Sequence, residues 1–175
     1  MKRPAAHIST ERSPRSLRGR RLRVPAPDSL YLHALAARAT FSAYEKHKAQ
    51  PRRFGLPPYT GARDEETTYC DADAGFAPGD ARRIPRWLSC GILAGLVGKS
   101  DSLGDPSLVW VLSEDGWIFE GRITTPGRAQ YHGYPVLPNE AIAIDVLERY
   151  SSWGRRTNDP ETRAIAESCR RRYIR

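Results

Sequence analysis

Apolar residues recur at helical spacing in the first part of the chain that follows its basic N-terminal stretch. A helix is predicted over residues 28–50, because Asp28 offers an N-cap and Pro51 a stop. Its apolar stripe advances by four, three, four and three positions and consists of Leu30, Ala34, Ala37, Phe41 and Tyr44. The stripe has to be buried, either against the rest of the protein or against a partner.

Three further helices are predicted from the same periodicity. The first covers residues 85–97, where Gly91 and Gly95 form a groove that lets another backbone approach closely. A second follows Asn139 and a third follows Asp159, which precedes a proline at the first helical position. The apolar ridges of these three helices are Leu88, Ile92 and Leu96; Ile142, Val146, Tyr150 and Trp153; and Ile165, Cys169 and Tyr173.

Aromatic and β-branched residues predict a hairpin between these helices. Its strands are residues 108–112 and 117–124, joined by a turn at 114–116, and a short third strand is expected at 128–131. On the second strand, Glu120 and Arg122 lie two positions apart and so point to the same face. The pattern predicts an α+β fold, with a small antiparallel sheet of about three strands packed with three to four helices.

Composition divides the chain into four parts. We expect a disordered basic tail at residues 1–27, the amphipathic helix at 28–50, a linker rich in Pro and Gly at 51–67 and a compact α+β domain at 68–175. The 175 residues suit one core of ordinary size, and no apolar run approaches the roughly 20 residues that a membrane span needs. We therefore expect a soluble protein that does not contact membranes.

The net charge of +8 is concentrated at the N-terminus, where residues 1–27 carry eight Lys or Arg and a single Glu. A tail of this kind attracts nucleic acid or another polyanion, and the alternative is a solvated, disordered extension with no specific partner. The candidate nucleic-acid-binding residues are Arg12, Arg15, Arg18, Arg20, Arg21 and Arg23 in the tail, and Arg82, Arg83 and Arg86 beside Trp87. The alternative for the last three is a solvated basic edge compensated by neighbouring aspartates.

Cysteine usage indicates free thiols and a cytoplasmic location. Cys70, Cys90 and Cys169 are widely spaced and form no CxxC pair, so neither a disulfide framework nor a zinc site is expected. Asp71 and Asp73 open like a calcium loop, but Arg82 stands where that loop needs a bidentate Glu, and local turns are the simpler interpretation. We expect no metal and no cofactor.

One cluster suggests catalysis. Glu120, Arg122 and His132, with Tyr131 and Tyr134, supply a carboxylate base, a guanidinium and an imidazole acid on adjacent strands. These groups suit metal-independent phosphodiester cleavage, in which the carboxylate takes the 2′-hydroxyl proton and the histidine protonates the leaving oxygen. The alternative is a cross-strand Glu–Arg ion pair and a histidine held in a turn.

Three functional hypotheses follow. The first is a small cytoplasmic, bacterial binding or accessory protein that contacts nucleic acid or another polyanion through its basic tail. The second is a metal-independent, toxin-like enzyme of the ribonuclease type that uses Glu120, Arg122 and His132. The third is an adaptor that docks a protein partner through the helix at 28–50.

Overall fold

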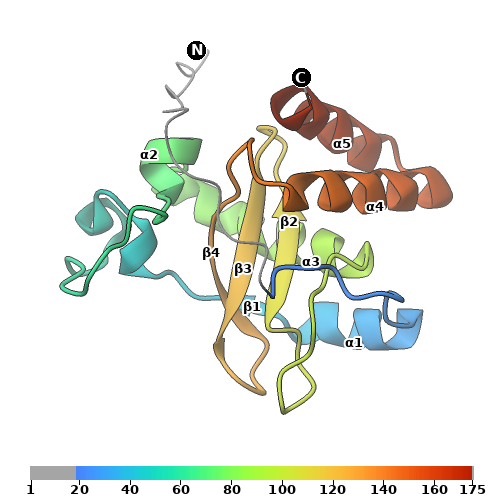
Figure 1. The fold of residues 1–175 in the computed structure, drawn as a ribbon, viewed down its shortest axis with the longest axis horizontal. Coiled ribbons are helices and arrows are strands. Elements are labelled where there is room, and N and C mark those ends of the chain that lie inside the picture. The colour runs from blue at the N-terminus through green and yellow to red at the C-terminus, as the bar shows by residue number, and fades with distance from the viewer. Residues whose placement is uncertain (1–18, 175) are drawn as a thin grey trace.

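The computed structural model describes residues 19–174 and has the predicted α+β architecture (Figure 1). Four strands form one sheet in the order β1-β4-β3-β2. β2 (Leu108–Leu112), β3 (Ile118–Thr125) and β4 (Gln130–Pro135) are antiparallel, and the two-residue β1 (Thr40–Phe41) pairs with β4 in parallel. Four long helices and the single-turn α2 (Cys70–Ala74) accompany the sheet.

The predicted hairpin is confirmed, and the third strand is longer than expected. β4 pairs with β3 from Gln130, which faces Thr125, to Pro135, which faces Phe119. The alternation of side chains along β3 is also as predicted. Glu120 faces Trp110 and Tyr134 on the two neighbouring strands, and Arg122 faces His132.

The helix predicted over residues 28–50 is much shorter. α1 covers Ser29–Arg38, with the Asp28 carboxylate accepting a hydrogen bond from the Tyr31 N–H at 2.9 Å. It ends because Ala39 is extended and the Thr40 N–H donates to the Ala129 carbonyl at the edge of the sheet. Residues 40–48 therefore leave helical geometry, and only Glu45–His47 form a 3₁₀ turn.

α1 packs on α3 (Ile84–Leu93) through its buried residues Leu32 and Leu35. The predicted apolar stripe is therefore wrong for this helix, since Leu30, Ala34 and Ala37 are exposed. The stretch at residues 51–67, which was expected to be a linker, is also anchored to the fold at its end. The buried Thr68, which follows it directly, donates from its hydroxyl to the Pro135 carbonyl at 3.1 Å. The division of the chain at residues 28, 51 and 68 stays a prediction about folding units. The structure packs these parts together.

α3 ends earlier than the predicted range of 85–97. Gly95 has a φ of +76°, a conformation that L side chains rarely adopt, and so it ends the helix instead of lining a groove on it. Gly91 meets the expectation of close approach, because a Cβ there would collide with the Trp110 carbonyl of β2. α3 therefore lies directly against one face of the sheet.

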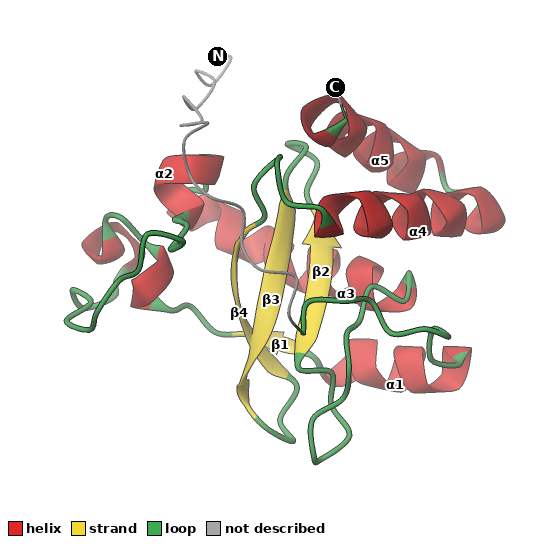
Figure 2. Ribbon diagram, viewed as in Figure 1, coloured by secondary structure: helices red, strands yellow, loops and turns green. Residues whose placement is uncertain are grey.

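The two C-terminal helices pack against each other beside β2 (Figure 2). α4 spans Ile142–Thr157 and α5 spans Pro160–Tyr173. The predicted cap of α5 is confirmed, since the Asp159 carboxylate accepts from the N–H groups of Glu161 and Thr162. The predicted Asn139 cap is wrong: α4 begins three residues later, after a turn in which the Glu140 carboxylate accepts from the Leu137 N–H at 2.8 Å.

The expectation of a disordered tail does not hold for residues 19–24. Arg20 and Leu22 are buried, and the Arg23 N–H donates to the Val97 carbonyl at 2.8 Å. The rest of that tail, including Arg12, Arg15 and Arg18, lies outside the described residues. Between residues 19 and 174, no helix combines the length and the apolar character needed to cross a membrane.

Candidate functional site

A buried polar row crosses the sheet at its centre. Glu120 on β3 is fully buried, and its Oε2 accepts from Trp110 Nε1 on β2 at 3.1 Å, while its Oε1 accepts from the Tyr134 hydroxyl on β4 at 2.5 Å. The N-terminal segment completes the row, since Arg20 Nε donates to Glu120 Oε2 at 2.7 Å. Arg20 also binds Glu140, with 2.6 Å between Nη1 and Oε2.

A second row, one pair further along the same face, is only partly exposed to solvent. Arg122 and His132 are opposite each other on β3 and β4, and the Arg122 side chain is about half exposed. Arg122 Nε donates to the Tyr134 hydroxyl at 3.4 Å. His132 Nδ1 lies 3.1 Å from the Thr124 hydroxyl.

The segment after β1 brings a second histidine onto this row. The His47 and His132 rings are stacked, with centroids 5.8 Å apart and planes at 15°. His47 is buried, and its Nδ1 lies 3.1 Å from the Thr68 carbonyl, which can only accept, so Nδ1 carries a proton. Tyr44 meets the His132 ring edge-on, at a centroid distance of 4.9 Å.

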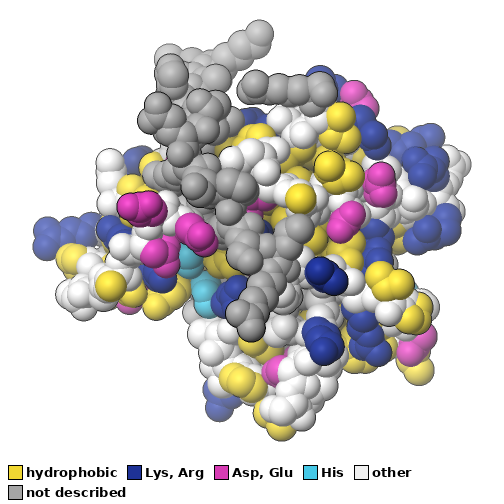
Figure 3. Space-filling model, viewed as in Figure 1, with side chains coloured by type: hydrophobic (Ala, Val, Ile, Leu, Met, Phe, Trp, Pro, Cys, Tyr) yellow, Lys and Arg dark blue, Asp and Glu magenta, His cyan; other side chains and the backbone are white. Residues whose placement is uncertain are grey.

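These side chains line a groove of about 370 Å³ at the outer edge of the sheet. Besides the two histidines and Arg122, its walls include Tyr44, Lys46, Tyr59, Asp64, Glu66, Thr67 and Tyr134. Figure 3 shows histidine at the surface of this face, with acidic side chains gathered on one side of it and a basic side chain on the other. The groove therefore offers imidazole, guanidinium and aromatic groups to a ligand within a few ångströms of one another.

The groove lowers the pKa of His132 to about 4. Burial is the largest cause, and the positive charges of Arg122, Lys48 and Lys46 add to it. His132 is therefore neutral at pH 7, a form that accepts a proton. Burial likewise raises the pKa of Tyr134 to about 12, which keeps its hydroxyl protonated and able to donate to Glu120.

Two of the five predicted catalytic residues do not lie in the groove. Glu120 is buried beneath it and neutralised by Arg20, a position that does not suit a general base. Tyr131 points to the opposite face of the sheet, where its hydroxyl donates to the Pro106 carbonyl at 3.0 Å. The structure brings Arg122, His132 and Tyr134 together, and His47 joins them although the sequence did not single it out.

Tyr44, Lys46 and His47 were not predicted as site residues, because the expected helix ran through them. Nothing in their spacing signals a site, since a helix would have pointed Tyr44 and His47 to one side and Lys46 to another. Their place depends on β1 pairing with β4, which joins parts of the chain that are far apart in sequence.

The predicted nucleic-acid-binding arginines are placed differently from one another. Arg20 is buried on Glu120 and Glu140, so it is not available to a polyanion, contrary to the prediction. Arg83 pairs with Asp80, Glu114 and Asp115, and Arg86 pairs with Glu161, which fits the alternative of a compensated edge. Arg21, Arg23 and Arg82 are exposed at the surface.

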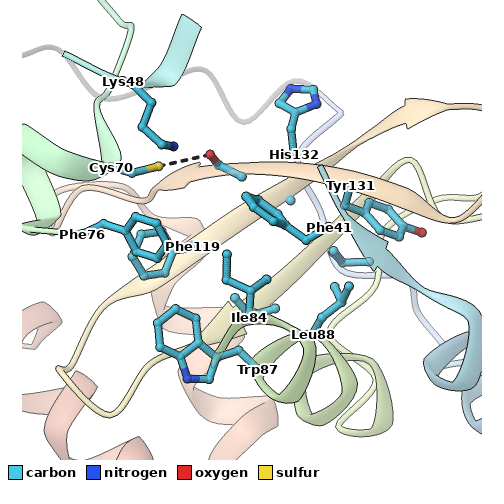
Figure 4. A pocket seen from close by; sticks show the side chains of 14 residues that line it. Phe41, Lys48, Cys70, Phe76, Ile84, Trp87, Leu88, Phe119, Tyr131 and His132 are labelled. Atoms are coloured by element: carbon cyan, nitrogen blue, oxygen red, sulfur yellow. Dashed lines mark hydrogen bonds between the residues drawn. The ribbon is translucent and has the colours of Figure 1, made fainter. Parts of the chain in front are cut away.

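A separate apolar cavity of about 50 Å³ lies on the other side of β4, between the sheet and α3 (Figure 4). Lys48 points to Cys70 there, and the Cys70 thiol donates to the Gly133 carbonyl at 3.2 Å. Burial raises the pKa of Cys70, so its thiol is a poor nucleophile at pH 7. The cavity has room for little more than one water molecule, which is too small for a substrate.

The aspartates that resemble the start of a calcium loop accept hydrogen bonds from backbone N–H groups, and only Asp73 does so locally. The Asp71 carboxylate accepts from the N–H groups of Ala49 and Gln50, and Asp73 accepts from the Tyr69 N–H. Across residues 19–174, no group of three or more His, Cys, Asp or Glu side chains is arranged to hold a metal ion. Comparison of the chain with models of known families, with curated proteins and with solved structures finds no match in any of the three.

Proposed function

We propose that the chain is a metal-independent enzyme of the ribonuclease type and that it acts in the groove at His132. One observation carries this proposal: two stacked imidazoles, His47 and His132, stand beside the half-exposed guanidinium of Arg122. A phosphodiester cleaved by its own 2′-hydroxyl needs a base, an acid and a stabiliser of phosphoryl charge, and these three groups are of the required kinds.

The roles differ from those expected from the sequence. His132, which is neutral at pH 7, takes the proton of the 2′-hydroxyl in place of the buried Glu120. His47 in its protonated form gives a proton to the leaving 5′-oxygen. Arg122 binds the non-bridging oxygens of the phosphate, and Lys46, which lines the groove beside Asp64, adds positive charge.

The basic tail supports this proposal, because it could bind RNA while the groove cleaves it. Most of its positive charge precedes residue 19, so the hypothesis that it binds nucleic acid stays a prediction. In the proposed enzyme, the tail holds RNA by non-specific electrostatic attraction and the groove performs the chemistry. The adaptor hypothesis stays a prediction: Leu30, Ala34 and Ala37 of the stripe that suggested it are exposed on α1, while Leu32 and Leu35 pack within the chain.

The test is cleavage of RNA by the purified full-length chain in excess EDTA. We expect RNA to be cut and DNA of the same sequence to be spared, because DNA lacks the 2′-hydroxyl. His132→Ala and His47→Gln should each reduce the rate about 10²-fold or more, and Arg122→Lys should also impair it, because a point charge does not reproduce bidentate contact.

The matched control is His33→Ala, since His33 is an exposed histidine on α1, away from the groove. This variant should cleave RNA at the rate of the wild type. Circular dichroism should show that all variants are folded. A rate unchanged by His132→Ala would refute the mechanism, and intact RNA with the wild-type protein would refute the proposed function.

A further inference from the structure

The guanidinium of Arg20 is held inside the protein by two carboxylates. Its side chain is 5% exposed, and Glu120 and Glu140 on either side of it are fully buried. A buried ion pair of this kind contributes little net stability, because desolvation offsets the attraction between the charges. The effect of this ion pair on neighbouring charged residues is more important, because one of those residues, Arg122, lines the groove.

Glu120 connects this ion pair to the groove. Its Oε1 is 3.9 Å from Arg122 Nη2, and the Tyr134 hydroxyl contacts both residues. Glu120 therefore has two arginines within reach, one from the interior and one from the groove. With Arg20 in place, Arg20 holds the closer contact, at 2.7 Å.

Without Arg20, the buried Glu120 would lose its closest positive charge. An unpaired carboxylate in the interior is costly, and among residues 19–174 Arg122 is the other arginine beside Glu120 that could replace Arg20. The Arg122 guanidinium would then turn inward and leave the groove.

We propose that Arg20 is a positioning residue of the groove: it neutralises Glu120 from within the protein and so leaves Arg122 to bind a phosphate. This inference rests on the proposed function, in which the groove binds the phosphodiester of RNA. Arg20 itself touches no substrate. Arg20 belongs to the segment that the sequence predicts to bind nucleic acid. In this proposal it instead affects the affinity of the groove for phosphate through its ion pair with Glu120 in the interior.

The test compares Arg20→Ala with Arg156→Ala in the full chain. The two variants remove the same charge, but Arg156 is exposed on α4 outside the groove, whereas Arg20 binds Glu120 in the interior. The probes are inorganic phosphate and a 2′-deoxy dinucleotide, which is not cleaved, and binding is measured by titration. We expect Arg20→Ala and Arg122→Ala each to weaken binding about tenfold or more and Arg156→Ala to leave it unchanged.

A second readout follows the position of Arg122 directly. The charge of Arg122 helps to hold down the pKa of His132, alongside Lys46 and Lys48. Removal of Arg122 from the groove should therefore raise the pKa of His132, which is measured by NMR titration of the imidazole signals. Loss of stability alone would not shift this pKa in a protein that remains folded.

A triple variant keeps the proposal testable if Arg20→Ala does not fold. Arg20→Met with Glu120→Gln and Glu140→Gln removes all three charges of the buried cluster, so that no buried carboxylate is left unpaired and Arg122 is no longer drawn inward. The triple variant should bind phosphate nearly as tightly as the wild type. Weak binding by the folded triple variant, or tight binding by a folded Arg20→Ala, would overturn the inference.

The outcomes separate this inference from the proposed function. If the wild type binds neither probe, or if Arg122→Ala binds as well as the wild type, the proposed function fails at the groove itself. If Arg122→Ala weakens binding and Arg20→Ala does not, the groove binds phosphate as proposed and only the role of Arg20 is wrong.

Discussion

His132 shows how the surroundings of a single side chain set its chemistry. The usual pKa of histidine is about 6.5, and the groove lowers that of His132 to about 4, chiefly through burial. The unfolded chain therefore takes up a proton at His132 between these two values while the folded chain does not. Folding stability should fall as the pH falls from about 6.5 to about 4, because the unfolded state binds the extra proton.

We predict that His132→Gln loses less stability on acidification than the wild type does. The difference in slope between the two proteins should be at most about 1.4 kcal/mol per pH unit, and smaller in practice because water reaches part of the ring. Urea unfolding at several values of pH measures it. His33→Gln on the surface of α1 is the control, and equal slopes for wild type and His132→Gln would show that the ring titrates normally.

At the scale of elements, the contact between α3 and β2 sets the distance between this helix and the sheet that carries the groove. Gly91 sits on α3 where any Cβ would collide with the Trp110 carbonyl and lie 3.1 Å from Val111 Cγ1. Trp110 in turn donates to Glu120, so this contact supports the buried polar row from the opposite face. A backbone carbonyl in a central strand cannot move aside without disturbing the sheet.

We predict that Gly91→Ala destabilises the protein by about 1–3 kcal/mol, although alanine is the better helix former. Gly79 is the matched control, since a Cβ there meets nothing within 4 Å, and Gly79→Ala should be neutral or slightly stabilising. The midpoint of urea unfolding measures both. A Gly91→Ala protein as stable as the wild type would show that α3 can move away from the sheet.

For the whole molecule, the N-terminal stretch divides into two parts with different roles. Residues 1–18 carry five Lys or Arg and one Glu, whereas residues 19–24 are anchored in the fold by the buried side chains of Arg20 and Leu22. A basic segment acts on nucleic acid by neutralising phosphates and releasing counterions. The buried side chains act on the fold instead.

We predict that deletion of residues 1–18 weakens RNA binding and makes it less dependent on salt. The logarithmic slope should become shallower by about 0.7 for each RNA phosphate that the shortened chain no longer neutralises. Deletion of residues 1–27 should in addition lower the melting temperature relative to the shorter deletion, because it removes Arg20 from Glu120 and Glu140. Filter binding and thermal melting test the two effects. Equal melting temperatures for the two deletions would contradict the role assigned to residues 19–24.

Features that depend on neighbours along the chain can be predicted from the sequence. Asp28 and Asp159 cap their helices because a carboxylate before a helix reaches the first free N–H groups. The hairpin follows from two β-rich runs and a turn between them, and the two-residue period of a strand puts Glu120 and Arg122 on one face. Each of these features is fixed within a few residues, where local sterics and hydrogen bonds decide.

The side-chain contacts across the sheet join residues that are far apart in the sequence, and they became visible only in the tertiary structure. Arg20 reaches Glu120 from 100 positions earlier in the chain, and this ion pair turns a predicted catalytic base into a buried partner. His47 reaches His132 only because α1 stops and β1 joins the edge at β4. Pairings of this kind leave no periodic signal in the sequence, because they arise from burial and charge pairing among segments that the folded chain brings together.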